Sequence, residues 1–126
     1  MSHKLLIVEE SAAVREILAD LLGEAGFAVV TAEDGLAGLD RAWCDRPDLI
    51  LTDIQLPHLD GIQMIRRLQQ QPELQGIPVL VLSAVQKGTL RQAASAGAAE
   101  APPKPLLIGN LIGLIRGVLS RAAARG

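Results

Sequence analysis

Short apolar runs alternate with longer amphipathic stretches along the whole chain. The apolar runs have the length of buried strands, and each is followed by a segment long enough for a helix. This alternation predicts five strand-plus-helix units, and therefore an α/β fold with a parallel sheet. The predicted strands are Lys4–Val8, Ala28–Thr31, Asp48–Thr52, Ile77–Leu82 and a weaker one at Ala98–Pro102.

Apolar residues at intervals of three and four positions mark the predicted helices. The first helix begins after Ser11, a residue type that caps helix N-termini, and stops at Gly26. Its apolar positions are Val14, Ile17, Leu18, Leu21, Leu22 and Ala25. The later helices are predicted to begin at Asp34, Asp60, Lys87 and about Leu107.

The last predicted helix, which ends at about Ala122, has more apolar residues than one buried face needs. A wide buried face explains them, and so does an apolar patch that meets a partner or a twin subunit in a homodimer. The tail from Arg121 is expected to fray. The extra apolar residues beside the core stripe are Leu107, Leu114 and Val118.

The composition fits one α/β domain over residues 1–126. Hydrophobic residues make up 49% of the chain and aromatic residues only 2%. The core must therefore consist of Leu, Ile, Val and Ala, which is typical of a parallel sheet covered by helices. The net charge of −2 argues against a nucleic-acid-binding module, because such modules carry a basic face.

Cysteine content and hydropathy point to a cytoplasmic protein. Cys44 is the only cysteine, so no internal disulfide can form, and a lone thiol fits a reducing compartment. No segment approaches the roughly 18 consecutive apolar residues that a membrane span requires. We therefore expect no membrane association.

Chemically capable side chains gather where the predicted strands end. In a parallel sheet the carboxyl ends of the strands meet at one edge, and this edge receives Glu9, Glu10, Asp53, Ser83 and Lys104. Adjacent carboxylates repel each other, and a divalent cation such as Mg²⁺ relieves that cost. With an amine and a hydroxyl nearby, the set suits phosphoryl transfer onto the Asp53 carboxylate.

The stretches around these residues resemble the receiver domain of response regulators in bacterial two-component systems, particularly the single-domain, chemotaxis-type receivers. The resemblance covers nearly the whole chain. It implies a flavodoxin-like (βα)5 fold, a doubly wound five-stranded parallel sheet with strand order 2-1-3-4-5. The stretches that carry it are Leu5–Glu10, Asp48–Gly61, Pro78–Ala84, Gly97–Ala98 and Lys104–Pro105.

The resemblance also assigns roles to the clustered residues. A histidine kinase or a histidine phosphotransfer protein would donate the phosphoryl group, and a downstream protein would read the change by contact. Such a domain assists its own phosphorylation and dephosphorylation but is not a turnover enzyme. The implied roles are phospho-acceptor for Asp53, Mg²⁺ ligands for Glu9, Glu10, Asp53 and the backbone carbonyl of Gln55, switch hydroxyl for Ser83 and charge partner for Lys104.

Departures from the family pattern keep a second hypothesis open. Glu10 stands where the family usually has Asp, Ala101 replaces the usual switch aromatic, and Pro102 and Pro103 interrupt the fifth predicted strand. These features favour a receiver-fold adaptor that binds its partner without phosphorylation. An aspartyl phosphatase is disfavoured, because Gln55 stands where such enzymes usually carry a second acid.

Overall fold

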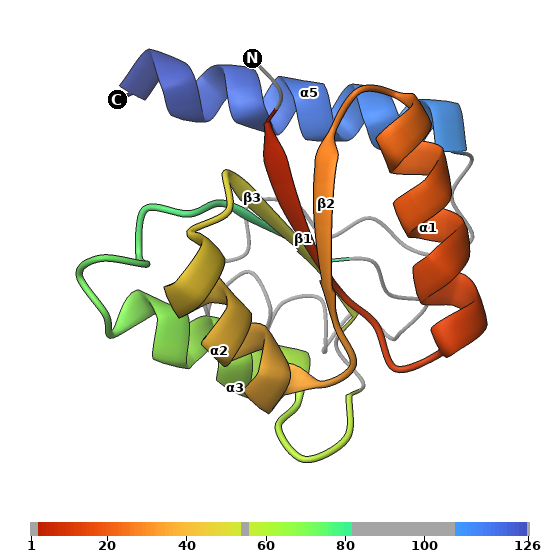
Figure 1. The fold of residues 1–126 in the computed structure, drawn as a ribbon. Coiled ribbons are helices and arrows are strands. Elements are labelled where there is room, and N and C mark those ends of the chain that lie inside the picture. The colour runs from red at the N-terminus through yellow and green to blue at the C-terminus, as the bar shows by residue number, and fades with distance from the viewer. Residues whose placement is uncertain (1–2, 54–55, 82–107, 126) are drawn as a thin grey trace.

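The computed structural model describes residues 3–53, 56–81 and 108–125. Within them, strands and helices alternate along the chain as the hydrophobic pattern predicts (Figure 1). The fourth predicted helix and the fifth predicted strand lie outside the described residues. The elements are β1 (Lys4–Val8), α1 (Ala12–Glu24), β2 (Ala28–Ala32), α2 (Gly35–Asp45), β3 (Leu49–Thr52), α3 (Gly61–Gln69), β4 (Val79–Val81) and α5 (Ile108–Arg125).

The four described strands form one parallel sheet in the order β2-β1-β3-β4. This order agrees with the predicted flavodoxin-like arrangement. The central strands β1 and β3 are paired in register, with Leu5 opposite Leu49 and Val8 opposite Thr52. Both are buried on both faces, which explains why they read as continuous apolar runs.

Helix N-termini form where the sequence supplies a capping side chain. Ser11, Asp34 and Asp60 each accept a hydrogen bond from the backbone N–H three residues ahead, as predicted for residues of these types. The α1 helix ends before Gly26, whose φ of 101° lies in the left-handed region that favours glycine. These local signals determine where the three helices begin and where α1 ends.

Alternating residues of each strand point into two separate hydrophobic cores. One core lies on the face covered by α2 and α3, and the other on the face covered by α1 and α5. Strand residues at odd and even positions divide between them, because side chains alternate along a strand. The first core takes Leu6, Val8, Ile50, Val79 and Val81 from the strands, and the second takes Leu5, Ile7, Leu49, Leu51 and Leu80.

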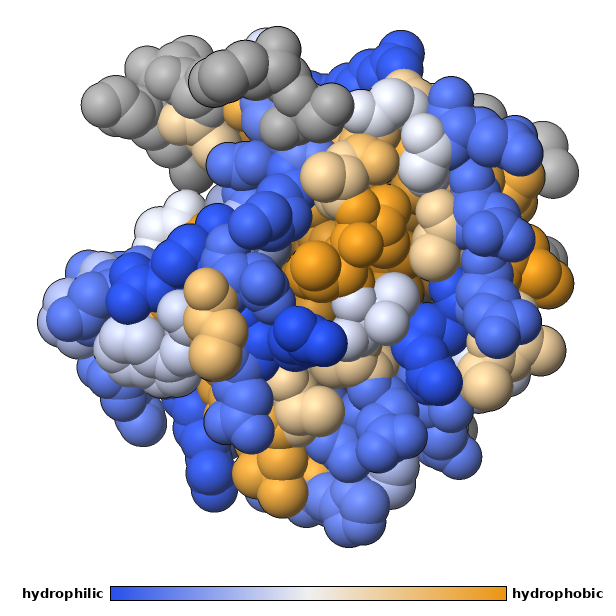
Figure 2. Space-filling model, viewed as in Figure 1, coloured by the Kyte–Doolittle hydropathy of each residue, from blue (hydrophilic) through white to orange (hydrophobic). Residues whose placement is uncertain are grey.

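The edge strand β2 is less covered than the central strands. Its Val29 and Val30 are only partly buried. Figure 2 shows hydrophobic side chains at the surface here, between α1 and α2. No helix of the described residues is long and apolar enough to cross a membrane.

Two details of the helices differ from the sequence prediction. Val14, Ile17 and Leu21 on α1 are exposed, so the predicted apolar stripe extends beyond the face that packs on the sheet. The expected fraying from Arg121 is wrong, because α5 continues to Arg125. Alanine is the strongest helix former, and three alanines precede Arg125.

The extra apolar residues of α5 are explained in part by burial. Val118 is in the core, and Leu114 is partly buried against it. Leu107 lies outside the described residues. The large apolar side chains that the described residues leave exposed are on α1 and α2.

Candidate functional site

The register of the sheet brings Glu9 and Asp53 to adjacent positions at its carboxyl edge, the side of the sheet where the C-terminal ends of the parallel strands lie. Val8 and Thr52 are paired, so the residues that follow them leave the sheet side by side. The Asp53 N–H donates to the Val8 carbonyl at 3.3 Å, and the Glu9 N–H donates to the Ala32 carbonyl at 3.0 Å. The backbone positions of both acids are therefore held by the ends of three strands.

Glu9 is buried, with 9% of its surface exposed. Its carboxylate accepts a hydrogen bond from the backbone N–H of Ser11 at 3.3 Å. Burial of a charged group is costly unless hydrogen bonds or opposite charges compensate it. Glu9 is thus a carboxylate that the fold keeps inside the edge of the sheet, beside Asp53.

Arg15 stabilises the connection that carries the acidic pair. Its guanidinium donates to the carbonyl of Glu9 at 2.7 Å and to that of Glu10 at 3.4 Å. This residue was not among the predicted site residues. Arg15 lies in the first turn of α1 and contacts backbone atoms of the segment before the helix. No sequence motif signals contacts of this kind.

Asp53 is half-buried at the end of β3. The buried Thr52 fixes its backbone, because the Thr52 hydroxyl donates to the Asp53 carbonyl at 2.9 Å. A half-buried carboxylate on a rigid strand end can be reached from solvent while its orientation is maintained. This is the environment that a carboxylate nucleophile needs.

Glu10 lies apart from this arrangement. It is exposed, and the described residues contain no group of three acidic, histidine or cysteine side chains placed to hold a metal ion. The structure therefore places Glu9 and Asp53 together and leaves Glu10 at the rim. The other predicted site residues, Gln55, Ser83 and Lys104, lie outside the described residues.

The donor set at this edge suits a hard cation. Mg²⁺ prefers a small number of carboxylate and carbonyl oxygens and retains several waters. Glu9 and Asp53 supply two carboxylates at neighbouring strand ends, one buried and one half-buried. These residues fit an Mg²⁺ ion.

The loop after Asp53 is attached to the start of α2. His58 has a φ of 66°, and the Leu59 N–H donates to the Pro57 carbonyl at 2.7 Å, so the chain makes a tight turn at His58. Nδ1 of His58 lies 2.8 Å from Oδ2 of Asp34. The left-handed conformation costs a non-glycine residue about 1 kcal/mol, and this contact helps to hold it.

Asp34 has two roles at this junction. Its side chain caps α2 by accepting from the Ala37 N–H at 2.8 Å, and its other oxygen contacts His58. The hydrogen bond from Ala37, followed by that from His58, holds the pKa of Asp34 below the usual aspartate value of 3.8. The His58 contact was not predicted, because the two residues are 24 positions apart.

The chain matches the family model described as the response regulator receiver domain over residues 5–116. It is 37% identical over 122 residues to "Response regulator MprA" of Mycobacterium bovis strain BCG, a match that covers 96% of this chain and 52% of the relative. The MprA protein of Mycobacterium ulcerans is 36% identical over the same length. The chain therefore spans about half the length of these relatives.

Solved structures show the same fold. A putative response regulator from Chloroflexus aurantiacus has a TM-score of 0.90 and 30% identity, with 95% of this chain and 99% of that chain covered. The chemotaxis protein CheY4 of Vibrio cholerae has a TM-score of 0.87 and 26% identity, covering 94% and 99%. The receiver domain of the Pseudomonas aeruginosa sensor kinase PA1611, solved with magnesium in its active site cleft, has a TM-score of 0.83 and 26% identity, covering 96% and 97%.

Proposed function

Because this chain belongs to the response-regulator receiver family of two-component signalling, we propose that it accepts a phosphoryl group on Asp53. The observation that supports this role is the register of β1 and β3, which sets the half-buried Asp53 beside the buried Glu9. Family members bind Mg²⁺ in the active site, and a magnesium-bound receiver is among the structural neighbours. Receivers are signalling domains and generally not turnover enzymes.

The proposed reaction is an in-line transfer to a carboxylate. An oxygen of Asp53 attacks the phosphorus, an acyl phosphate bond forms, and the bond from phosphorus to the donor breaks as the donor leaves with its electron pair. Glu9, Asp53 and the backbone carbonyl of Gln55 would hold Mg²⁺, with the exposed Glu10 at the rim of the site, and the bound ion would neutralise charge on the phosphoryl oxygens. The ammonium of Lys104 and the hydroxyl of Ser83 would bind the remaining phosphoryl oxygens.

Receivers partner with histidine kinases or histidine phosphotransfer proteins, and we propose that one of these donates to this chain. A donor must approach the carboxyl edge, where α1 begins three residues after Glu9. This helix exposes Val14, Ile17 and Leu21, and 58% of Ile17 is accessible. An exposed apolar stripe on the helix that begins at this edge supports docking of a protein donor there.

The first experiment is incubation with Mg²⁺ and acetyl phosphate followed by intact-mass measurement. We expect the mass of one phosphoryl group to be added to the wild type, and none to be added to Asp53→Asn or in the presence of EDTA. Asp60→Asn is a suitable control, because Asp60 caps α3 through its side chain and an asparagine caps equally well. If Asp53→Asn is labelled as fully as the wild type, Asp53 is not the acceptor.

The exposure of Glu10 favours a second candidate function, the phosphate-independent adaptor. Among the described residues, the three acids do not form a three-ligand metal group. An adaptor would bind its downstream protein equally well as wild type and as Asp53→Ala. A receiver that signals by phosphorylation would bind its downstream protein more tightly when phosphorylated, and Asp53→Ala would abolish that gain in binding.

A further inference from the structure

The outer side of α2 carries a stripe of large apolar side chains. Leu36 is 47% exposed and Trp43 is 41% exposed, and the partly buried Leu39 lies between them at helical spacing. Trp43 is the only tryptophan of the chain. Burying a side chain of this size stabilises a structure by about 1.5–3 kcal/mol, so its exposure beside a second large apolar residue points to a surface that is covered in use.

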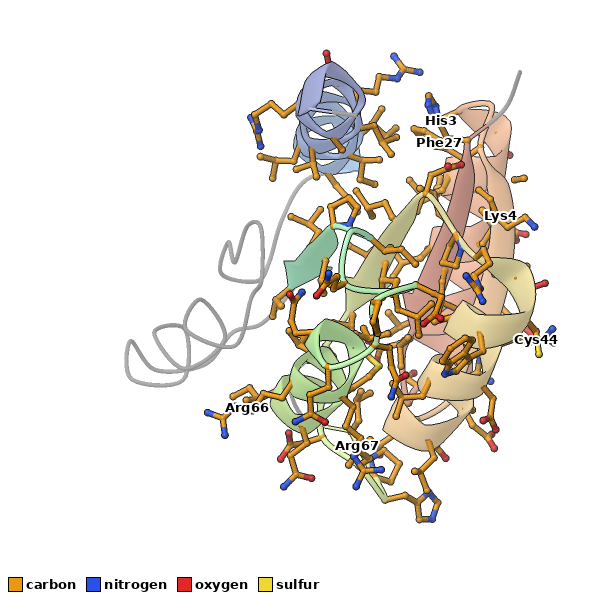
Figure 3. The ribbon with its side chains drawn as sticks, turned by 90° about the vertical axis from the view of Figure 1, so that its left-hand side faces the viewer. His3, Lys4, Phe27, Cys44, Arg66 and Arg67 are labelled. Atoms are coloured by element: carbon orange, nitrogen blue, oxygen red, sulfur yellow. The ribbon has the colours of Figure 1, made fainter. Side chains whose placement is uncertain are left out.

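These residues form one side of a groove between α2 and the end of α3. Its volume is about 470 Å³, and Arg67 and Gln71 supply the other side. Figure 3 views this face and shows Arg67 leaving α3 on the side of α2, whereas Arg66 points away from it. The remaining polar residue of the groove is Asp40, on α2.

The groove offers one negative and one positive side chain for pairing. Within the described part of the chain, neither the Asp40 carboxylate nor the Arg67 guanidinium forms an ion pair. By contrast, Arg41 and Asp45 on the same helix pair with each other at 3.4 Å. The groove thus presents an unpaired acid on one side and an unpaired base on the other, next to an apolar stripe.

Such a surface is complementary to itself. In a two-fold interface each copy uses the same patch. Every contact therefore occurs twice: if residue i of the first copy touches residue j of the second, residue j of the first also touches residue i of the second. Two copies of this groove, related by a two-fold axis that runs along it, match acid to base twice and lay the apolar stripe of each copy over the α3 side of the other copy's groove. A partner of uniform charge would match only one of the two ionic groups.

We propose that the groove between α2 and α3 docks the same groove of a second copy of this chain. In this dimer Leu36 and Trp43 of each copy pack against the α3 side of the other copy's groove, and Asp40 of each copy faces Arg67 of the other. A stable interface commonly buries about 800 Å² per partner. An interface limited to this groove would bury less than that, so we expect a weak dimer with a dissociation constant of roughly 1 µM to 1 mM.

The proposal is tested by sedimentation velocity of the full chain over roughly 10 µM to 1 mM, a range that spans weak association. We expect a monomer–dimer equilibrium. The fluorescence of Trp43 should shift to shorter wavelength over the same concentrations, because the indole leaves water as the dimer forms. A monomer at every concentration would overturn the proposal.

Charge exchange locates the interface. Asp40→Arg and Arg67→Asp should each weaken association at least tenfold, because each places like charges opposite each other twice. A mixture of the two variants should associate at least as well as the wild type, because each chain supplies the charge that the other has lost. Recovery in the mixture also shows that both variants are folded.

Matched controls change the same charges elsewhere. Arg66→Asp alters the neighbouring arginine that points away from the groove, and Asp20→Arg alters an exposed acid of α1. Both should leave association unchanged. If the controls weaken association as much as the groove variants, or if the mixture of groove variants stays monomeric, the interface lies elsewhere and the proposal is wrong. Loss of association only in Leu114→Asp would assign the dimer to α5 instead.

Discussion

Among the glycines that the structure describes, Gly35 leaves the least room for a side chain. It opens α2, and a methyl group built on it would overlap the carbonyl oxygen of Leu59 and lie 2.8 Å from the carbonyl carbon. Both are backbone atoms of the loop that follows Asp53. Gly35→Ala must therefore push that loop away from α2 and strain the contact between His58 and Asp34.

The size of the effect follows from the contact. Overpacking a close-packed site costs about 1–3 kcal/mol, and a backbone neighbour that cannot rotate away places Gly35→Ala near the upper end. Gly113 provides the matched control, because it lies exposed inside α5 with no atom within 4 Å of its added methyl group. Gly113→Ala should stabilise the protein by about 0.5–1 kcal/mol through helix propensity.

Urea unfolding followed by circular dichroism measures both variants. We expect opposite signs, a difference of about 3–4 kcal/mol between the two free energies of unfolding, and melting temperatures about 10–15 °C apart. Equal stability of the two variants would refute the close approach of Leu59 to α2. Gly35→Ala should also slow phosphorylation by acetyl phosphate, since the displaced loop begins at the acceptor.

Two further predictions concern stability. Asp34→Ala should lower the free energy of unfolding by about 1–2 kcal/mol at neutral pH. Because the pKa of Asp34 in the folded protein lies below 3.8, its contribution to stability is present above that pH and is lost as the pH falls through the folded value. Urea titrations should therefore show the deficit of the variant shrinking below about pH 4, and a deficit that grows in acid would contradict this. Ile115→Ala, at a fully buried position of α5, should lower the free energy of unfolding by about 2–5 kcal/mol, whereas Ile17→Ala on α1 should lower it by less than about 0.5 kcal/mol. Similar losses in the two variants would mean that α1 is packed differently.

The order of elements and their caps could be predicted from the sequence because those signals are local. A buried strand needs an apolar run, and a helix N-terminus needs a capping side chain at a fixed spacing, as at Ser11 and Asp34. The neighbouring positions of Glu9 and Asp53 follow from the parallel topology alone. The prediction of the strand order, which the four described strands confirm, therefore required no knowledge of side-chain packing.

Contacts that depend on loop conformation could not be predicted in this way. The pairing of Asp34 with His58 requires a left-handed turn at His58, and the contacts of Arg15 require the path of the chain after β1. The exposure of Ile17 and Trp43 was also not evident, because helical periodicity identifies apolar positions without showing which of them find a neighbour.

The central claim, that Asp53 is the phospho-acceptor, is tested most directly by chemical trapping. The protein is phosphorylated with acetyl phosphate and Mg²⁺ and then treated with borohydride, which reduces an aspartyl phosphate to homoserine, and the peptides are sequenced by mass spectrometry. We predict homoserine at position 53, dependent on Mg²⁺ and absent without the phosphodonor. Homoserine at another aspartate, or a phosphoryl group that resists reduction because it is carried by a hydroxyl, would contradict the assignment of Asp53.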